Sequence, residues 1–418
     1  MAQENRKSRF PAPLPNPTEN LAPDYPDQDE PTNPDIAIPK KLSGSAPNSP
    51  PTPAETFVQP TPPPTTRMPE MGPIEIFMKD PTITEIMVND IRNVMIEREG
   101  KLSFSGFTFT AIDELNRVVR NILEFSGRNL TPEQPYADLM LPDGSRVNIV
   151  GPPITVTGPS VTIRKFPASH FSIHDLLARE MLDRRMAFFM NACIQGRLNI
   201  LISGGTGSGK TTLLNSLTDL IPKGERLITI EDTAELSITH TNSVRMQTQP
   251  ATPFSDGISA RDLMSNALRM RPDRIIIGEC RRGEAFDMLQ AMNTGHEGSI
   301  TSIHANSTRD ALVRLETLGM MAGVELPLIA IRKQIANAVD LIVQIKRHRS
   351  GKRRMVSIAE VTGMEGDVIT VQDVFQWESR SGQAGHEGQG VFKITGLVPT
   401  FMDRLREAGI EFPAGFFG

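Results

Sequence analysis

The chain has 418 residues, a formal net charge of −5 and an aromatic content of 5%. This length suits two or three domains, while the acidic balance and the scarcity of stacking rings argue against nucleic-acid binding. The apolar runs are too short or interrupted to span a bilayer, no signal peptide is visible, and two cysteines cannot form a disulfide framework, which fits a reducing compartment.

Residues 1–70 differ in composition from the rest of the chain and hold 18 of its 34 prolines, mixed with polar residues. Such a segment cannot bury enough apolar surface to offset the entropy lost on ordering. The composition therefore predicts a disordered, partly polyproline II tail. Its proline patches would suit a partner, but a spacer is the plainer interpretation.

A small α+β domain is predicted over 71–166. An apolar stripe at helical spacing runs through 112–123 and is followed by Gly127, which is typical of a helix end. A short helix is expected at 74–78, and strands are expected at 82–89, 94–98, 102–109, 137–141, 147–150 and 160–165. A linker is predicted over 167–175, where Ser172 would cap a helix at 173–182.

Residues 176–379 alternate apolar strands with helices, which is the pattern of a parallel α/β sheet. Strands are expected at 198–203, 226–231, 274–278, 298–303 and 341–346. A flexible segment and a small C-terminal piece, with a helix at 399–408, are predicted over 380–418.

A complete phosphate-binding loop follows the first of these strands. It consists of Gly204, Gly205, Thr206, Gly207, Ser208, Gly209, Lys210 and Thr211, and Thr212 continues into a helix. The glycines let backbone N–H groups turn inward around a phosphate, because a Cβ would block that approach. Lys210 supplies charge to the β- and γ-phosphates of ATP or GTP, and Thr211 offers its hydroxyl to Mg²⁺. A chance Gly-rich turn is the alternative, but strand, loop and helix come in the required order.

Three further strings end expected strands. IEDTAE at 230–235 is acidic, IIIGECR at 275–281 ends on Gly-Glu, and GSITSIHAN at 298–306 contains His304. Arg146 and Arg164 lie at strand ends near the domain junction. Each feature alone has an ordinary explanation, since acidic residues cap helices, a strand-end histidine is more often structural, and exposed arginines are common.

Together and in this order, the loop and the strings closely resemble the secretion-type ATPases of type II and type IV secretion systems and type IV pili. In that family they are the Walker A motif, the Asp box, an atypical Walker B motif and the His box. The resemblance covers residues 72–376, and LPDGSRVN, TIRKF, RMRPDRIIIGECR, LQAMNTGHEGS and SIHANS look most like the Tad (Flp-type) pilus branch. This sequence departs from the Tad branch in two features. Arg282 stands where that branch has glycine, and the proline-rich tail stands in place of an N-terminal helical region. They put in doubt the packing beside Glu279 and the docking of partners.

The resemblance implies a RecA-like P-loop ATPase domain preceded by a small α+β, PAS-like domain. It makes Glu279 the leading candidate for positioning the attacking water, with Glu231 as competitor or co-actor, and His304 a γ-phosphate sensor. Gly278 replaces the usual Walker B aspartate, so Mg²⁺ is expected on Thr211, phosphate oxygens and water.

The resemblance also implies that Arg146 and Arg164 are arginine fingers, in a homo-hexamer whose active sites lie between domains. The predicted function is a cytoplasmic motor ATPase, peripheral at the inner membrane, that drives Tad-type pilus assembly, with retraction left open as an additional activity. Its expected partners are inner-membrane platform proteins, with indirect membrane contact and no nucleic acid. The alternatives are an ATPase of a type IV secretion or DNA-transfer system, a nucleotide-gated assembly module with little turnover, and a RecA-type helicase, which the composition disfavours.

The predicted ATPase function assigns no role to one basic segment. KRHRSGKRR at 346–354 surrounds a Ser-Gly turn. A solvated turn is the plainer interpretation, and contact with anionic lipid or with an acidic loop of a membrane protein is the alternative.

Overall fold

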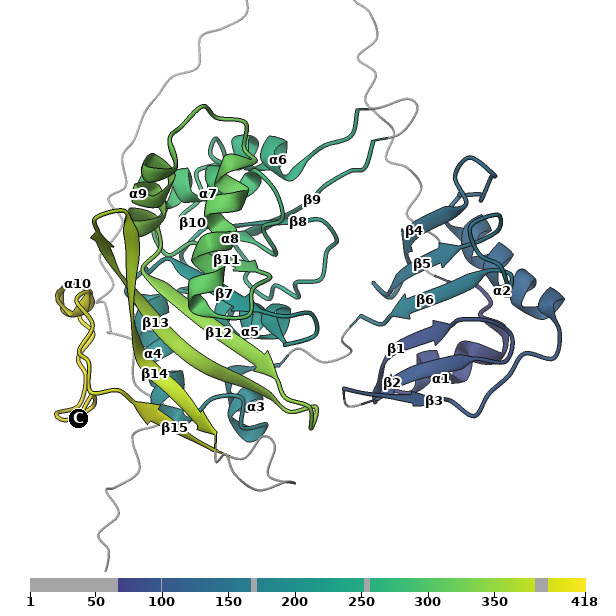
Figure 1. Cartoon of the computed structure of the whole chain (residues 1–418), viewed down its shortest axis with the longest axis horizontal. Coiled ribbons are helices and arrows are strands. Elements are labelled where there is room, and N and C mark those ends of the chain that lie inside the picture. The colour runs from purple at the N-terminus through teal and green to yellow at the C-terminus, as the bar shows by residue number, and fades with distance from the viewer. Residues whose placement is uncertain (1–66, 99, 167–170, 252–255, 380–389) are drawn as a thin grey trace, which may run out of the picture. The chain divides into compact units, whose positions relative to one another are not determined.

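The computed structural model describes residues 67–98, 100–166, 171–251, 256–379 and 390–418 (Figure 1). The predicted tail up to residue 66, residues 167–170 of the predicted linker and residues 380–389 of the predicted flexible segment lie outside this description. The strands that are described form two sheets, one of six strands and one of nine.

The six-stranded sheet is antiparallel throughout, in the order β3-β2-β1-β6-β5-β4. Its strands are β1 (Ile83–Val88), β2 (Val94–Arg98), β3 (Lys101–Phe104), β4 (Tyr136–Met140), β5 (Arg146–Val150) and β6 (Ser160–Arg164). Its helices are η1 (Gly72–Ile74), α1 (Glu75–Lys79) and α2 (Ile112–Phe125). The α+β character predicted for this region is confirmed.

One face of this sheet packs on the helices. Val147 and Ile163 are register partners and fully or almost fully buried, in one core with Leu115 and Val118 of α2. Because side chains alternate along a strand, Arg146 and Arg164, which are also register partners, lie on the other face. The sheet register therefore brings the two predicted finger residues side by side.

The nine-stranded sheet has the order β15-β14-β13-β12-β7-β11-β10-β8-β9, in which β12 through β9 run parallel and β13, β14 and β15 are antiparallel. Its strands are β7 (Ile200–Gly204), β8 (Leu227–Glu231), β9 (Ser243–Gln247), β10 (Arg274–Ile277), β11 (Ile300–Ile303), β12 (Leu341–Arg347), β13 (Arg353–Glu365), β14 (Val368–Ser379) and β15 (Gly390–Ile394).

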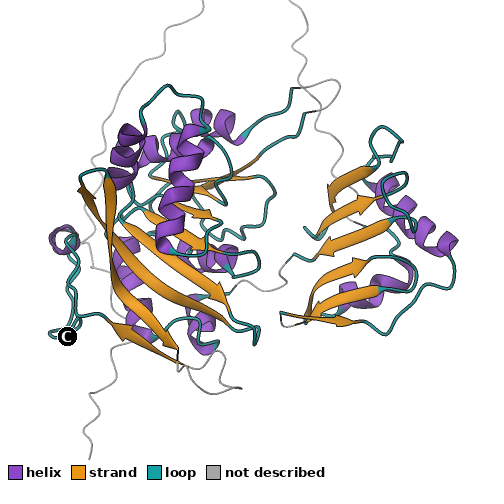
Figure 2. Cartoon of the chain, in the orientation of Figure 1, coloured by secondary structure: helices purple, strands orange, loops and turns teal. Residues whose placement is uncertain are grey.

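Helices cover both faces of this sheet (Figure 2). They are α3 (Ile173–Ala178), α4 (Arg184–Gln195), α5 (Lys210–Thr218), α6 (Ala260–Ala267), α7 (Glu284–Asn293), α8 (Thr308–Met320), α9 (Leu328–Ala338) and α10 (Met402–Glu407). Ile200 and Ile202 of β7 pack with α3, α4 and α5, whereas Leu201 packs with the helices of the opposite face. Burial on both faces explains the nearly continuous apolar runs of the parallel strands.

Two predicted boundaries are wrong for local reasons. The strand expected at 102–109 ends at Phe104, because the chain turns at Gly106, whose φ is +76°, and carries Phe109 into the core. The helix expected at 173–182 ends at Ala178, since Glu180 has a φ of +56°. The predicted Ser172 cap is confirmed: its side chain accepts a hydrogen bond from the Asp175 backbone N–H.

Several elements of the larger sheet were not predicted. Strands β13 and β14 form a long antiparallel pair, and β15 extends the sheet beyond them. Their sequences mix polar and apolar residues, because many of their side chains are only half-buried, as in β9 at the other edge.

Candidate functional site

The predicted phosphate-binding loop connects β7 with α5, in the order that the motif requires. Gly207 and Gly209 have φ values of +67° and +101°, a region that side chains rarely adopt. A Cβ on Gly204 would lie 2.5 Å from Ser208 Oγ and 2.7 Å from the Ile345 carbonyl oxygen. The loop therefore has the backbone of a phosphate cradle: conformation requires Gly207 and Gly209, space requires Gly204, and neither restricts Gly205.

Lys210, the first residue of α5, is buried with 7% of its surface exposed. Its ammonium donates to the carbonyl oxygens of Gly204, at 3.0 Å, and Gly205, at 3.4 Å. It also lies 3.3 Å from Nδ1 of His304, which follows β11. Burial lowers the pKa of Lys210.

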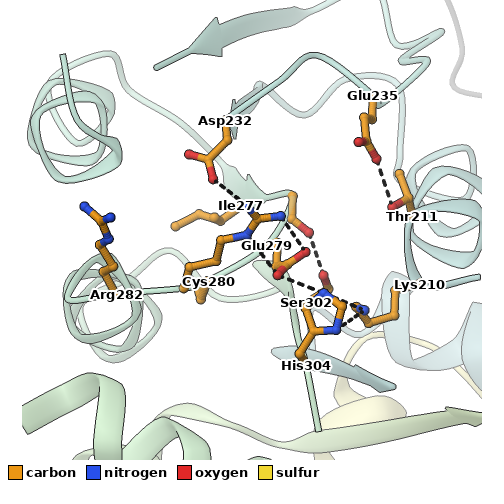
Figure 3. Close-up of polar contacts among 12 residues, drawn as sticks. Lys210, Thr211, Asp232, Glu235, Ile277, Glu279, Cys280, Arg282, Ser302 and His304 are labelled. Carbon is orange, nitrogen blue, oxygen red and sulfur yellow. Dashed lines mark hydrogen bonds and ion pairs between the residues drawn. The ribbon is translucent and has the colours of Figure 1, made fainter. Parts of the chain in front are cut away.

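Glu279 follows β10 and joins the same cluster (Figure 3). Its carboxylate lies 3.0 Å from Nε2 of His304, and Arg281 donates to both of its oxygens, at 3.0 and 3.3 Å. Burial raises the pKa of Glu279, but the Arg281 guanidinium and the nearby charges outweigh it and hold the pKa below its ordinary value. Burial and the Lys210 charge lower the pKa of His304. At neutral pH a neutral imidazole therefore lies between an ammonium and a carboxylate.

Glu231, the last residue of β8, has different surroundings. It is 5% exposed, and its Oε1 accepts hydrogen bonds from the backbone N–H groups of Glu235 and Leu236, both at 2.8 Å. Burial raises its pKa. The Glu231 side chain also fills the space beside Gly278, where a Cβ would lie 3.2 Å from Glu231 Cγ. Glu231 therefore holds the turn after β8 in place.

Arg146 and Arg164 line a small cavity of about 90 Å³ together with Thr211 and Glu235. Arg146 forms an ion pair with Glu235 at 3.1 Å, and Arg164 lies 3.9 Å from Glu85 of β1. Glu235 also lies 3.5 Å from the Thr211 hydroxyl (Figure 3). The structure thus brings both predicted arginines near the phosphate loop.

Two residues of this site were not predicted as functional. Glu235 links Thr211 to Arg146, and Arg281 links Glu279 to Asp232, whose carboxylate is 3.6 Å away. Both belong to the strings that pointed to the site, so their positions were visible in the sequence. The partners of Glu235 and Arg281 were not visible in the sequence, because these contacts join segments far apart in the chain or depend on the direction of a side chain.

The substitution at Arg282 does not disturb Glu279. Arg282 is exposed and points away from the cluster in Figure 3. The crowded position is the next residue, Gly283, where a Cβ would lie 2.8 Å from Ala322 Cα. The doubt about packing beside Glu279 is therefore removed.

Residues 68–400 match the family described as type II/IV secretion system protein. The chain belongs to this family. A putative conjugal transfer protein of Mycobacterium tuberculosis is 32% identical over 75% of this chain and 90% of the relative. The conjugal transfer protein TrbB of Rhizobium radiobacter is 36% identical over 70% and 86% of the two chains. The VirB11 ATPase of the Brucella suis type IV secretion system, solved with sulphate, is 29% identical over 68% and 91%, with a TM-score of 0.38.

Membership confirms the secretion-type ATPase resemblance. The two curated relatives named above carry conjugal-transfer names, so the Tad branch is not confirmed and the predicted alternative is supported better. Among the helices described for this secretion ATPase, none is long and apolar enough to cross a membrane. The described residues also contain no group of three or more His, Cys, Asp or Glu side chains that could hold a metal ion.

Proposed function

We propose that this chain is an ATP-hydrolysing motor of the type IV secretion kind. The observation that carries the proposal is the continuous polar chain from Lys210 through His304 to Glu279. These contacts connect the phosphate loop with the ionised carboxylate of Glu279, which follows another strand of the same sheet. Hydrolysis of ATP needs such a carboxylate to orient water in line with the γ-phosphate, and cations to neutralise charge in the transition state.

Each residue of the site has a separate role in ATP binding and hydrolysis. The loop N–H groups and Lys210 bind the phosphates, and Glu279 orients the water. His304 contacts both Lys210 and Glu279, so it is suited to sense the γ-phosphate. Thr211 would hold Mg²⁺ together with phosphate oxygens and water, which suits an ion that keeps most of its water ligands. The ion, when bound, neutralises charge on the phosphates.

The proposal includes Arg146 and Arg164 as arginine fingers. Both side chains are partly exposed on one sheet face, and both line the cavity that contains Thr211. It also includes an N-terminal domain over 71–166 and an ATPase domain over 176–379, because the two sheets have separate cores. Closure of one domain on the other in a homo-hexamer would then convert ATP binding into movement.

The partners we propose are the membrane proteins of a type IV secretion or conjugal-transfer machine, on the cytoplasmic side of the inner membrane. The names of the relatives support this choice. A Tad pilus motor is the second candidate, and the strings LPDGSRVN and SIHANS favour it. The two candidates share the same ATPase chemistry and differ in what the ring moves.

ATP turnover of the full-length chain tests the proposal. It should be measured alone, with single-stranded DNA, and with vesicles that carry the membrane proteins encoded beside it. We expect turnover that the vesicles stimulate and DNA does not. Turnover absent in all three conditions would instead favour the nucleotide-gated assembly module, and stimulation by DNA alone would favour a helicase.

A further inference from the structure

The basic segment at 346–354 forms the end of the β12–β13 hairpin. Arg347 and Arg353 are register partners across this strand pair, and their side chains are 27% and 36% exposed. Two like charges directly opposite each other destabilise a strand pair. Their position therefore needs an explanation other than a solvated turn.

Both arginines lie beside the phosphate loop. Arg353 Nε donates to the Gly207 carbonyl oxygen at 2.9 Å. A Cβ on Gly209 would lie 3.2 Å from Arg353 Cδ, and a Cβ on Gly207 would lie 3.1 Å from Arg347 Nη1. The hairpin thus packs against the loop at Gly207 and Gly209.

The hydrogen bond from Arg353 acts on a peptide group of the cradle. The Gly207 carbonyl belongs to the same peptide unit as the Ser208 N–H, so a donor that fixes the carbonyl also fixes the direction of that N–H. The bond is charge-assisted, hence stronger than a neutral one, and hydrogen bonds in series polarise each other. The Ser208 N–H itself donates to the Gly205 carbonyl oxygen at 3.3 Å, so Arg353 and Gly205 together fix this peptide within the loop.

The acidic group that compensates these cations is Glu97 of β2. Its carboxylate lies 3.2 Å from Arg347 and 4.0 Å from Arg353. Burial lowers the pKa of Arg353, and the charge of Arg347 lowers it further. Among the residues that the structure describes, Glu97 is the carboxylate that lies within 4.0 Å of both guanidinium groups.

We propose that Arg353 is a positioning residue of the nucleotide site, which fixes the peptide joining Gly207 and Ser208 and thereby the conformation of the phosphate loop. The inference rests on the proposed ATPase function. It assigns the basic hairpin to nucleotide affinity and not to lipid contact. Arg347 lies beside Gly207 of the same loop. The positive φ of Gly207 and its lack of a Cβ let the hairpin approach the loop.

The test uses the full-length chain with Arg353→Met, which keeps the apolar stem beside Gly209 and removes the guanidinium. We expect the Kd of a fluorescent ADP analogue and the KM for ATP to rise about tenfold or more, as for the loss of one hydrogen bond from a charged group. The kcat should stay within about twofold, because Arg353 touches neither the water nor the γ-phosphate. Arg353→Lys should recover part of the affinity, since it keeps the charge and a donor.

Lys352→Met is the matched control, because Lys352 lies on the same hairpin but pairs with Glu180 and is exposed. It should bind the ADP analogue like the wild type. An equal loss of affinity in this control, or an unchanged Kd in Arg353→Met, would overturn the inference. If Arg353→Met does not fold, Arg353→Leu, which also lacks a donor, replaces it with the same expectation. Failure of the wild-type chain to bind the analogue would instead contradict the proposed function, so the two failures are distinguishable.

Discussion

Glu231 ends strand β8 and Glu279 follows the neighbouring parallel strand β10, yet their carboxylates have different environments. Glu231 is buried, accepts two backbone hydrogen bonds and has a raised pKa. Glu279 lies beside Arg281 and His304, and its pKa is lowered. At the residue scale, these neighbours favour Glu279 as the group that orients water.

Glu279→Gln keeps the size and hydrogen bonding of the side chain and removes its charge. ATP hydrolysis should fall by roughly 10²-fold or more while ADP still binds, since positioned acid–base groups contribute in that range. Steady-state turnover and equilibrium binding of an ADP analogue measure the two effects. Glu231→Gln is the comparison, and near-normal turnover in Glu279→Gln with loss in Glu231→Gln would transfer the role to Glu231.

Lys210→Ala removes the cation of the phosphate loop. Affinity for ADP should fall by about tenfold or more, because a charge-assisted contact with phosphate is lost, and ATP turnover should disappear. Binding is measured with the same analogue, and Lys223→Ala, on an exposed turn, serves as control. ADP affinity that is equal in both variants would show that the loop is not the nucleotide site.

The pH dependence follows from His304 and Glu279, which act as a neutral imidazole and an ionised carboxylate. The pKa of His304 is lowered from 6.5, and that of Glu279 is also below its ordinary value. The kcat/KM of the free enzyme should therefore stay level as pH falls through 6.5 and decline only at lower pH, where His304 gains a proton beside Lys210. In His304→Gln this step should vanish from the profile. A decline already centred above pH 6.5 in the wild type would contradict the assignment.

At the element scale, the sequence predicted the loop and every parallel strand except β9, because their signals are local. Apolar runs covered by helices on both faces are nearly continuous, and the phosphate loop is a contiguous motif. Strands β9, β13, β14 and β15 were missed, since half-buried residues give them a mixed pattern. The contacts of Arg353 with Gly207 and of Glu235 with Arg146 were also out of reach, because each joins segments that only the fold brings together.

A substitution at Gly283 tests how helix α7, which follows Glu279 in the chain, is held in place. The first residue of α7 follows Gly283, and a Cβ at this position would meet backbone atoms of Ala322 at the end of α8. Gly283→Ala should lower the stability by about 1–3 kcal/mol, the usual cost of overpacking. The chemical denaturation midpoint measures it, and Gly224→Ala, whose Cβ would meet nothing within 4 Å, should change it little. Equal midpoints in the two variants would mean that α8 moves aside at no cost.

At the scale of the whole molecule, the proposed coupling depends on groups from two sheets. Lys210, Glu279 and His304 lie at the carboxyl ends of parallel strands of the larger sheet, where ligands bind in open α/β folds. Arg146 and Arg164 belong to the smaller sheet, which carries no phosphate loop. The arginines can therefore act on ATP only through the approach of one sheet to the other, within one chain or between chains of a ring.

Arg164→Ala should leave the affinity for ADP almost unchanged and reduce ATP turnover by about 10³-fold, the lower end of the range for arginine fingers. Binding of the ADP analogue and turnover of the assembled protein measure this split, and Arg117→Ala, at an exposed arginine of α2, is the control.

Mixing inactive Arg164→Ala subunits with inactive Lys210→Ala subunits then shows whether the arginine acts within one chain or between chains. Recovery of activity means that an intact arginine of one chain serves the intact loop of another. An absence of recovery favours action within one chain or strict coupling around the ring. Unchanged turnover in both Arg164→Ala and Arg146→Ala would remove the fingers from the mechanism, and with them the proposed link between hydrolysis and movement.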